Sequence, residues 1–126
     1  MQYEVYVKGS INFIHSTKGS KKEFLKPHSH KWEVEVWLKT DSIENGISID
    51  FVYAKNLLNE VLSQLEGRYL NSLSYFNNKN PTAENIALFV YRELNKKFVY
   101  RESNKNLISK VKVGDKNYGI YIYIHP

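Results

Sequence analysis

Three histidines occupy positions from which they could share one metal ion. His28 and His30 lie in a stretch, Pro27 to Leu38, that alternates polar and apolar residues as a β-strand does. Side chains at i and i+2 of a strand share a face, so both imidazoles point to the side of Trp32, which is the expected buried side. Neutral imidazole is a preferred ligand of zinc, and two histidines one pleat apart can reach a single ion.

A third imidazole is available in an earlier alternating segment. His15 falls in phase with the apolar face of that segment, whose other members are Tyr3, Val5, Val7, Ile11 and Phe13. If the two segments pair as neighbouring strands, His15 lies opposite His28 and His30. Three histidines with one open position are typical of a catalytic zinc site, because the open position can hold water or substrate. The alternative is that His28 and His30 are ordinary polar residues of a strand.

Composition limits the remaining chemistry. The chain has 126 residues, which predicts a single domain over residues 1–126, and its 42% hydrophobic and 25% charged residues indicate neither disorder nor a membrane span. The start of the chain lacks the cationic residues and apolar run of a signal peptide, so we expect a cytoplasmic protein. There is no cysteine, which excludes disulfides, thiolate ligands and a cysteine nucleophile.

The net charge of +5 is compatible with an anionic ligand, either nucleic acid or a phosphorylated small molecule. Three lysines in the polar segment Ser16 to Glu23 could meet a phosphate near the metal, or could simply be solvated surface charge. No recognised nucleic-acid-binding motif is present, so we expect no nucleic-acid partner.

Two helices are predicted in the middle of the chain. The first begins at Asp50, a good N-cap, and ends near Gly67, with a buried stripe of Phe51, Ala54, Leu57, Leu58, Val61, Leu62 and Leu65. The second begins after Thr82, also a good N-cap, and is closed by the basic run Asn95 to Lys97. Its buried stripe contains Ala83, Ile86, Ala87, Val90 and Leu94.

The last third of the chain returns to strand. We expect a short edge strand over Val99–Arg101, a strand over Ile108–Val113, a turn over Gly114–Asn117 and a strand over Tyr118–Ile124. The order strand, strand, helix, helix, strand, strand predicts an α+β fold, with an antiparallel sheet and both helices on one face. Ten tyrosines, several on strand faces that would otherwise be exposed, favour contacts between subunits.

Several runs of residues resemble the family of 6-pyruvoyl tetrahydropterin synthase and 6-carboxytetrahydropterin synthase. They cover nearly the whole chain and are Phe13-Ile14-His15, His28-Ser29-His30, Ile49-Asp50-Phe51, Leu70-Asn71 and Asn80-Pro81-Thr82-Ala83-Glu84-Asn85-Ile86-Ala87. The resemblance implies a ββααββ tunnelling fold (T-fold) with a four-stranded sheet. It also implies a homo-oligomeric barrel, a hexamer made of two trimers, with active sites at subunit interfaces. It further implies that His15, His28 and His30 bind zinc and that the substrate is a reduced pterin such as dihydroneopterin triphosphate.

The chain departs from the family at the groups that move protons. The family's cysteine, four residues before the first histidine of the pair, is replaced by Phe24, and its Leu-Asp-His triplet appears as Leu65-Glu66-Gly67. The glutamate that anchors the pterin ring appears as Asp115, which could still bind a pterin or could be a turn aspartate. Thr82, within the long matching run, is the other substrate-binding residue that the resemblance implies.

Two carboxylates could replace the missing base. Glu23 neighbours Phe24, although alternation in an extended segment would turn it away from the side of Phe24, and Glu66 keeps a carboxylate in the triplet. The alternative for each is a plain surface carboxylate. The sequence thus predicts a zinc-dependent lyase of pterin or deazapurine-precursor metabolism with altered base groups. The competing hypothesis is a non-catalytic relative that binds zinc and pterin or partners an active paralogue.

Overall fold

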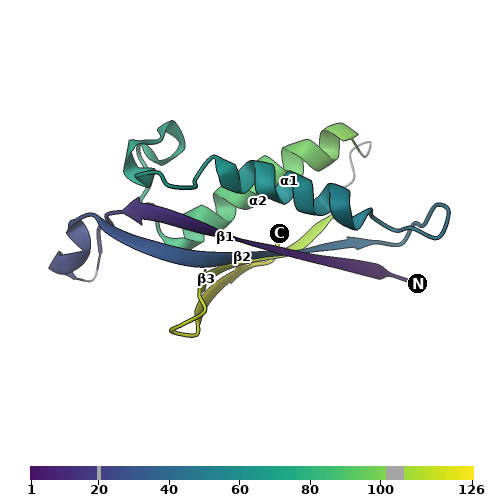
Figure 1. The fold of residues 1–126 in the computed structure, drawn as a ribbon, viewed down its shortest axis with the longest axis horizontal. Coiled ribbons are helices and arrows are strands. Elements are labelled where there is room, and N and C mark those ends of the chain that lie inside the picture. The colour runs from purple at the N-terminus through teal and green to yellow at the C-terminus, as the bar shows by residue number, and fades with distance from the viewer. Residues whose placement is uncertain (20, 102–106) are drawn as a thin grey trace.

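The computed structural model describes residues 1–19, 21–101 and 107–126 as a four-stranded sheet with two helices packed on one face (Figure 1). The main elements are β1 (Tyr3–His15), β2 (His28–Thr40), α1 (Phe51–Ser63), α2 (Ala83–Arg101), β3 (Ile108–Asp115) and β4 (Ile120–Ile124). Short 3₁₀ helices occupy the connections, namely η1 (Lys22–Leu25), η2 (Leu70–Ser72) and η3 (Ser74–Phe76). The predicted α+β class is confirmed.

All strand pairs are antiparallel, and the strands follow chain order β1-β2-β3-β4, so β1 and β4 form the two edges. The ladder between β1 and β2 is unbroken from Tyr3 opposite Thr40 to His15 opposite His28. Alternation explains this long pairing, because most residues at every second position of both strands are apolar and turned toward the helices. The register therefore fixes which residues meet at each end of the hairpin.

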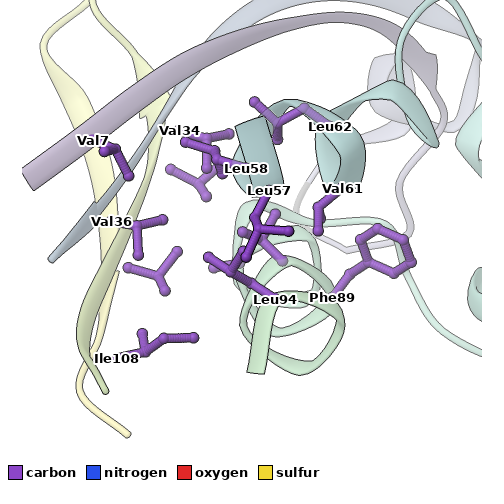
Figure 2. Packing of buried hydrophobic residues seen from close by; sticks show 14 of the residues in the cluster. Val7, Val34, Val36, Leu57, Leu58, Val61, Leu62, Phe89, Leu94 and Ile108 are labelled. Atoms are coloured by element: carbon purple, nitrogen blue, oxygen red, sulfur yellow. The ribbon is translucent and has the colours of Figure 1, made fainter. Parts of the chain in front are cut away.

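The hydrophobic core lies between the sheet and the helices (Figure 2). Val7, Val34 and Val36 of the strands face Leu57 and Leu58 of α1. Asp50 caps α1 as expected, since its carboxylate accepts a hydrogen bond from the backbone N–H of Tyr53 at 3.0 Å. The prediction that Phe51 belongs to the buried stripe was wrong: it is the first residue of the helix, and its side chain is 71% exposed.

The predicted ends of several elements were also wrong. Helix α1 ends at Ser63 rather than near Gly67, and α2 continues past the basic run to Arg101, so Val99–Arg101 is helix and not an edge strand. Phe98 explains the longer helix, because it is fully buried one turn after Leu94. None of the described helices is both long and apolar enough to cross a membrane.

The C-terminal hairpin forms with its turn displaced from the predicted position. β3 runs on through Gly114 to Asp115, and β4 begins at Ile120 instead of Tyr118. Asp115 accounts for the shift, because its Oδ1 accepts hydrogen bonds from the backbone N–H groups of Asn117 (2.9 Å) and Tyr118 (3.3 Å). This carboxylate closes the turn after β3.

The sheet face away from the helices carries its own polar cluster. Glu35 is only 8% exposed and accepts a hydrogen bond from the Tyr6 hydroxyl, while its other oxygen lies 3.1 Å from Nζ of Lys112. Lys112 also lies over the ring of Tyr121, 3.7 Å from its centroid. Burial acts to raise the pKa of Glu35, but the hydrogen bonds from Tyr6 and Lys112 outweigh it, and the net pKa is lowered. The cluster links all four strands where no helix covers them.

Candidate metal centre

The three predicted histidines meet at one end of the β1–β2 hairpin. His15 is the last residue of β1 and lies opposite His28, and the neighbouring pair on the same face is Phe13 opposite His30. The ring centroids of the three histidines are 4.5, 4.9 and 5.0 Å apart. One nitrogen of each ring lies within 4.8 Å of the others, a spacing that small ring rotations bring to the bond lengths of one divalent ion.

The histidines differ in exposure, which gives the cluster a closed side and an open side. His15 is buried, with 3% of its surface exposed, whereas His28 and His30 are half-buried. The ring of Phe24, from η1, lies against His28 with centroids 5.7 Å apart. His28 and His30 therefore form the more accessible side of the cluster.

Backbone carbonyls orient two of the rings. Nδ1 of His15 lies 2.8 Å from the carbonyl oxygen of Pro81, and Nδ1 of His28 lies 2.8 Å from that of Lys26. Because a carbonyl oxygen only accepts, each Nδ1 carries the proton and donates, which leaves the lone pair on Nε2. This is the arrangement in which ligand histidines of metal sites are usually held.

The local environment favours the neutral form of His15 and His30. Burial first, and then the neighbouring histidines His28 and His30, lower the pKa of His15 to about 4, against the opposing effect of the Pro81 carbonyl. Burial also lowers the pKa of His30, followed by the effect of His28, while the charge of Asp115 acts in the opposite direction. Neutral imidazole is the form that binds a metal, so the donor set fits a borderline divalent ion such as zinc.

Two asparagines that the sequence reasoning did not single out hold the segment after His15. Asn71 accepts from the backbone N–H of Ser16 and donates to the Ser16 carbonyl, both at 2.9 Å. The Asn80 side chain likewise accepts from the backbone N–H of Lys18 at 3.0 Å and donates to the Lys18 carbonyl at 2.6 Å. Each side-chain amide thus makes the pair of backbone hydrogen bonds that an adjacent strand would make. Their presence in the runs Leu70-Asn71 and Asn80-Pro81 was the one signal that could have found them.

The proposed substrate-binding residues lie on two sides of the cluster. Thr82 follows Pro81, whose carbonyl orients His15, and its hydroxyl accepts the backbone N–H of Asn85 at 3.3 Å as an N-cap. Asp115 follows Gly114, which pairs with Glu33, and so extends the core-facing side of β3 next to Trp32. Asp115 thus combines a turn-closing role with a charge that acts on His30.

The structure does not bring the two proposed base residues into the histidine cluster. Both oxygens of Glu66 are engaged by Asn12, through its backbone N–H at 2.9 Å and its side-chain amide at 3.2 Å. Glu23 is exposed in η1, a 3₁₀ helix, so the expected strand-like alternation between Glu23 and Phe24 does not apply. Among the described residues, only the three histidines form a cluster that could hold a metal.

Comparison with known proteins decides the family. The sequence model of 6-pyruvoyl tetrahydropterin synthase matches residues 4–125. The chain belongs to this family. It is 35% identical over 99 residues to a proposed 6-carboxy-5,6,7,8-tetrahydropterin synthase of Archaeoglobus fulgidus, an alignment that covers 77% of this chain and 82% of the relative. It is 30% identical over 96 residues to the dihydroneopterin monophosphate aldolase of Pyrococcus furiosus, covering 76% of this chain and 78% of the relative.

The fold of this family member agrees with solved structures. The 6-pyruvoyl tetrahydropterin synthase of Caenorhabditis elegans superposes with a TM-score of 0.78 at 17% sequence identity, covering 100% of this chain and 96% of that chain. The predicted ββααββ T-fold is therefore confirmed, with the antiparallel four-stranded sheet and two helices on one face.

Proposed function

We propose that this chain is a zinc-dependent lyase that acts on the side chain of a phosphorylated dihydropterin. The observation that carries the proposal is the set of three clustered imidazoles, two of them oriented by backbone carbonyls, in a member of a pterin-metabolising family. His15, His28 and His30 would hold the ion through ring nitrogens. Zinc, when bound, would supply a Lewis acid that polarises the oxygens of the substrate side chain.

The substrate class follows from the relatives. One bears the name of a 6-carboxytetrahydropterin synthase and the other that of a dihydroneopterin monophosphate aldolase. We propose dihydroneopterin triphosphate or dihydroneopterin monophosphate as the substrate of this chain. Asp115 could accept hydrogen bonds from the N–H groups of the pterin, and Thr82 would contact the substrate beside His15.

A lyase also needs a base that takes a proton from the substrate, which contributes typically 10²- to 10⁴-fold. We propose Glu23 and Glu66 as candidates. Glu23 is the better placed of the two, because it adjoins Phe24, whose ring contacts His28. Glu66 would first have to release both of its hydrogen bonds to Asn12.

A second candidate function is a non-catalytic subunit that binds zinc and a pterin or partners an active paralogue. The engagement of Glu66 by Asn12 favours it, as does the phenylalanine at position 24, because neither leaves a free base beside the histidines. The metal site would then serve binding alone.

We also propose that the protein is a cytoplasmic homo-oligomer, a hexamer of two trimers arranged as a barrel. The edge positions of β1 and β4 in the sheet support this, together with large exposed apolar side chains near the start of α1: Ile43, Ile47, Phe51 and Val52. Native mass spectrometry of untagged protein should give six copies, and a monomer at micromolar concentration would contradict the proposal.

The metal is tested first, by elemental analysis of protein purified without an affinity tag. We expect one zinc per chain, lost in His28→Ala and retained in His125→Ala, which removes the exposed histidine near the C-terminus. Equal zinc in both variants would contradict the proposed ligands.

Activity is tested with the two phosphorylated dihydropterins. Release of triphosphate or of a two-carbon phosphorylated aldehyde identifies a lyase, and its absence with pterin binding retained supports the non-catalytic subunit. Full turnover in both Glu23→Gln and Glu66→Gln would exclude both proposed bases.

A further inference from the structure

His30 is oriented differently from the other two histidines. The rings of His15 and His28 each donate a hydrogen bond to a backbone carbonyl, whereas His30 makes no such bond to any described residue. Its ring instead stacks on the indole of Trp32, with centroids 4.8 Å apart and planes inclined by 30°. The stack takes the place of the missing orienting hydrogen bond.

Trp32 also contacts two other aromatic rings at the cluster. Its ring meets His15 edge to face at 5.6 Å and Phe13 edge to face at 5.0 Å. Phe13 in turn contacts His15 at 5.1 Å and His30 at 5.7 Å, and it is almost fully buried. Trp32 and Phe13 therefore form an aromatic wall behind His15 and His30, while His28 is bounded by Phe24.

We propose that Trp32 is a positioning residue for a divalent cation, which fixes the imidazole of His30 by stacking and packs against the edge of His15. The proposal rests on the proposed metal function. An imidazole that is free to rotate about its Cβ–Cγ bond loses entropy when it binds an ion, whereas a stacked ring has already lost it. Apolar rings beside metal ligands also exclude water and strengthen the site.

The two tryptophans of the chain make the proposal testable by fluorescence. Trp37 lies on the same strand but on the opposite face, where Nζ of Lys110 sits 4.0 Å above its ring. Trp37→Phe leaves Trp32 as the one indole, and Trp32→Phe leaves Trp37. Titration of metal-free protein with Co²⁺ should quench Trp37→Phe to saturation at one equivalent and leave Trp32→Phe nearly unchanged. Equal quenching in both variants would overturn the proposal.

Zinc affinity gives the second readout, measured by competition with a chelating dye. Trp32→Ala should weaken zinc binding 10- to 100-fold, since loss of residues that support metal ligands typically has this effect. Trp32→Phe, which keeps an aromatic ring, should weaken it less, and the matched control Trp37→Ala should change it less than twofold. Unchanged affinity in folded Trp32→Ala would overturn the role of Trp32 alone. A wild-type protein that binds neither zinc nor cobalt would overturn the metal function itself.

Discussion

His15 and His28 form the final pair of the β1–β2 ladder, with their rings 4.5 Å apart on the core side of the sheet. The pair is held by the uninterrupted register that begins with Tyr3 opposite Thr40. A slip of one residue would turn one of the two rings to the other face, so the same alternation that builds the core also assembles the histidine cluster.

The stability of the metal-free protein should decrease as the pH is lowered, because of His15. The pKa of this residue is about 4 in the folded chain and near 6.5 in the unfolded chain, so the unfolded state binds more protons between these values. The contribution is fully present above pH 6.5 and is lost as the pH falls toward 4, by on the order of 3 kcal/mol.

Urea unfolding at a series of pH values, with a chelator present, checks the effect of His15. His15→Gln should flatten the profile, while His125→Gln should leave it as in the wild type. A wild-type stability that does not change between pH 7 and 4.5 would contradict the neutral, buried state of His15.

Removal of the Asn80 side chain should loosen the segment after His15. Asn80→Ala deletes both hydrogen bonds to Lys18, which we expect to cost about 1–3 kcal/mol of unfolding free energy and to weaken zinc binding. The control is Asn78→Ala, an exposed residue of the same loop. Thermal unfolding measures the loss of stability, and chelator competition measures the loss of zinc affinity. Equal results for Asn80→Ala and Asn78→Ala would contradict a role of Asn80 in holding this segment.

The ion pair on the open sheet face should matter more than an exposed one. Glu35→Gln leaves Lys112 with its charge unpaired and only 17% of its side chain exposed, and should cost about 1–3 kcal/mol. Glu4→Gln breaks the solvent-exposed contact with Lys39, 3.6 Å long, and should cost less than about 0.5 kcal/mol. Denaturant unfolding of both variants measures the two losses in unfolding free energy, and equal losses would contradict the prediction.

The C-terminal hairpin should not tolerate a side chain at Gly114. A Cβ at this position would lie 2.1 Å from the backbone oxygen of Ile120 and 2.7 Å from Cα of Tyr121, which are backbone atoms that cannot move aside freely. Gly114→Ala should therefore destabilise the protein by about 2 kcal/mol, and Asn117→Ala in the adjoining turn by less than about 0.5 kcal/mol. A normal melting temperature for Gly114→Ala would show that β4 can shift outward.

Much of this fold could be predicted because its signals are local. The alternation of apolar and polar residues predicts β1 and β2, and therefore the clustering of His15, His28 and His30. Asp50 indicates the start of α1. The end of α2 was missed because Lys96 and Lys97 resemble a C-terminal signal, although Phe98 continues the buried stripe. Phe51 was misassigned because helical spacing alone does not reveal that the first residue of α1 is exposed.

The connections of the histidine cluster could not be predicted, because they join residues far apart in the chain. Asn71 and Asn80 bind backbone groups 55 and 62 positions away, and Pro81 orients His15 through a carbonyl that every residue possesses. No residue type signals such a bond. The stack of Trp32 on His30, by contrast, lies within one strand and follows from its i, i+2 spacing.

All three imidazoles belong to the first hairpin, which is complete once the chain has been synthesised to Thr40, whereas the carbonyl that orients His15 belongs to Pro81. During translation the rings can therefore approach one another long before their final support leaves the ribosome. An ion bound early by the nascent hairpin would be held fully only when the segment before α2 has been synthesised, so the centre is completed only after Pro81 has joined the chain.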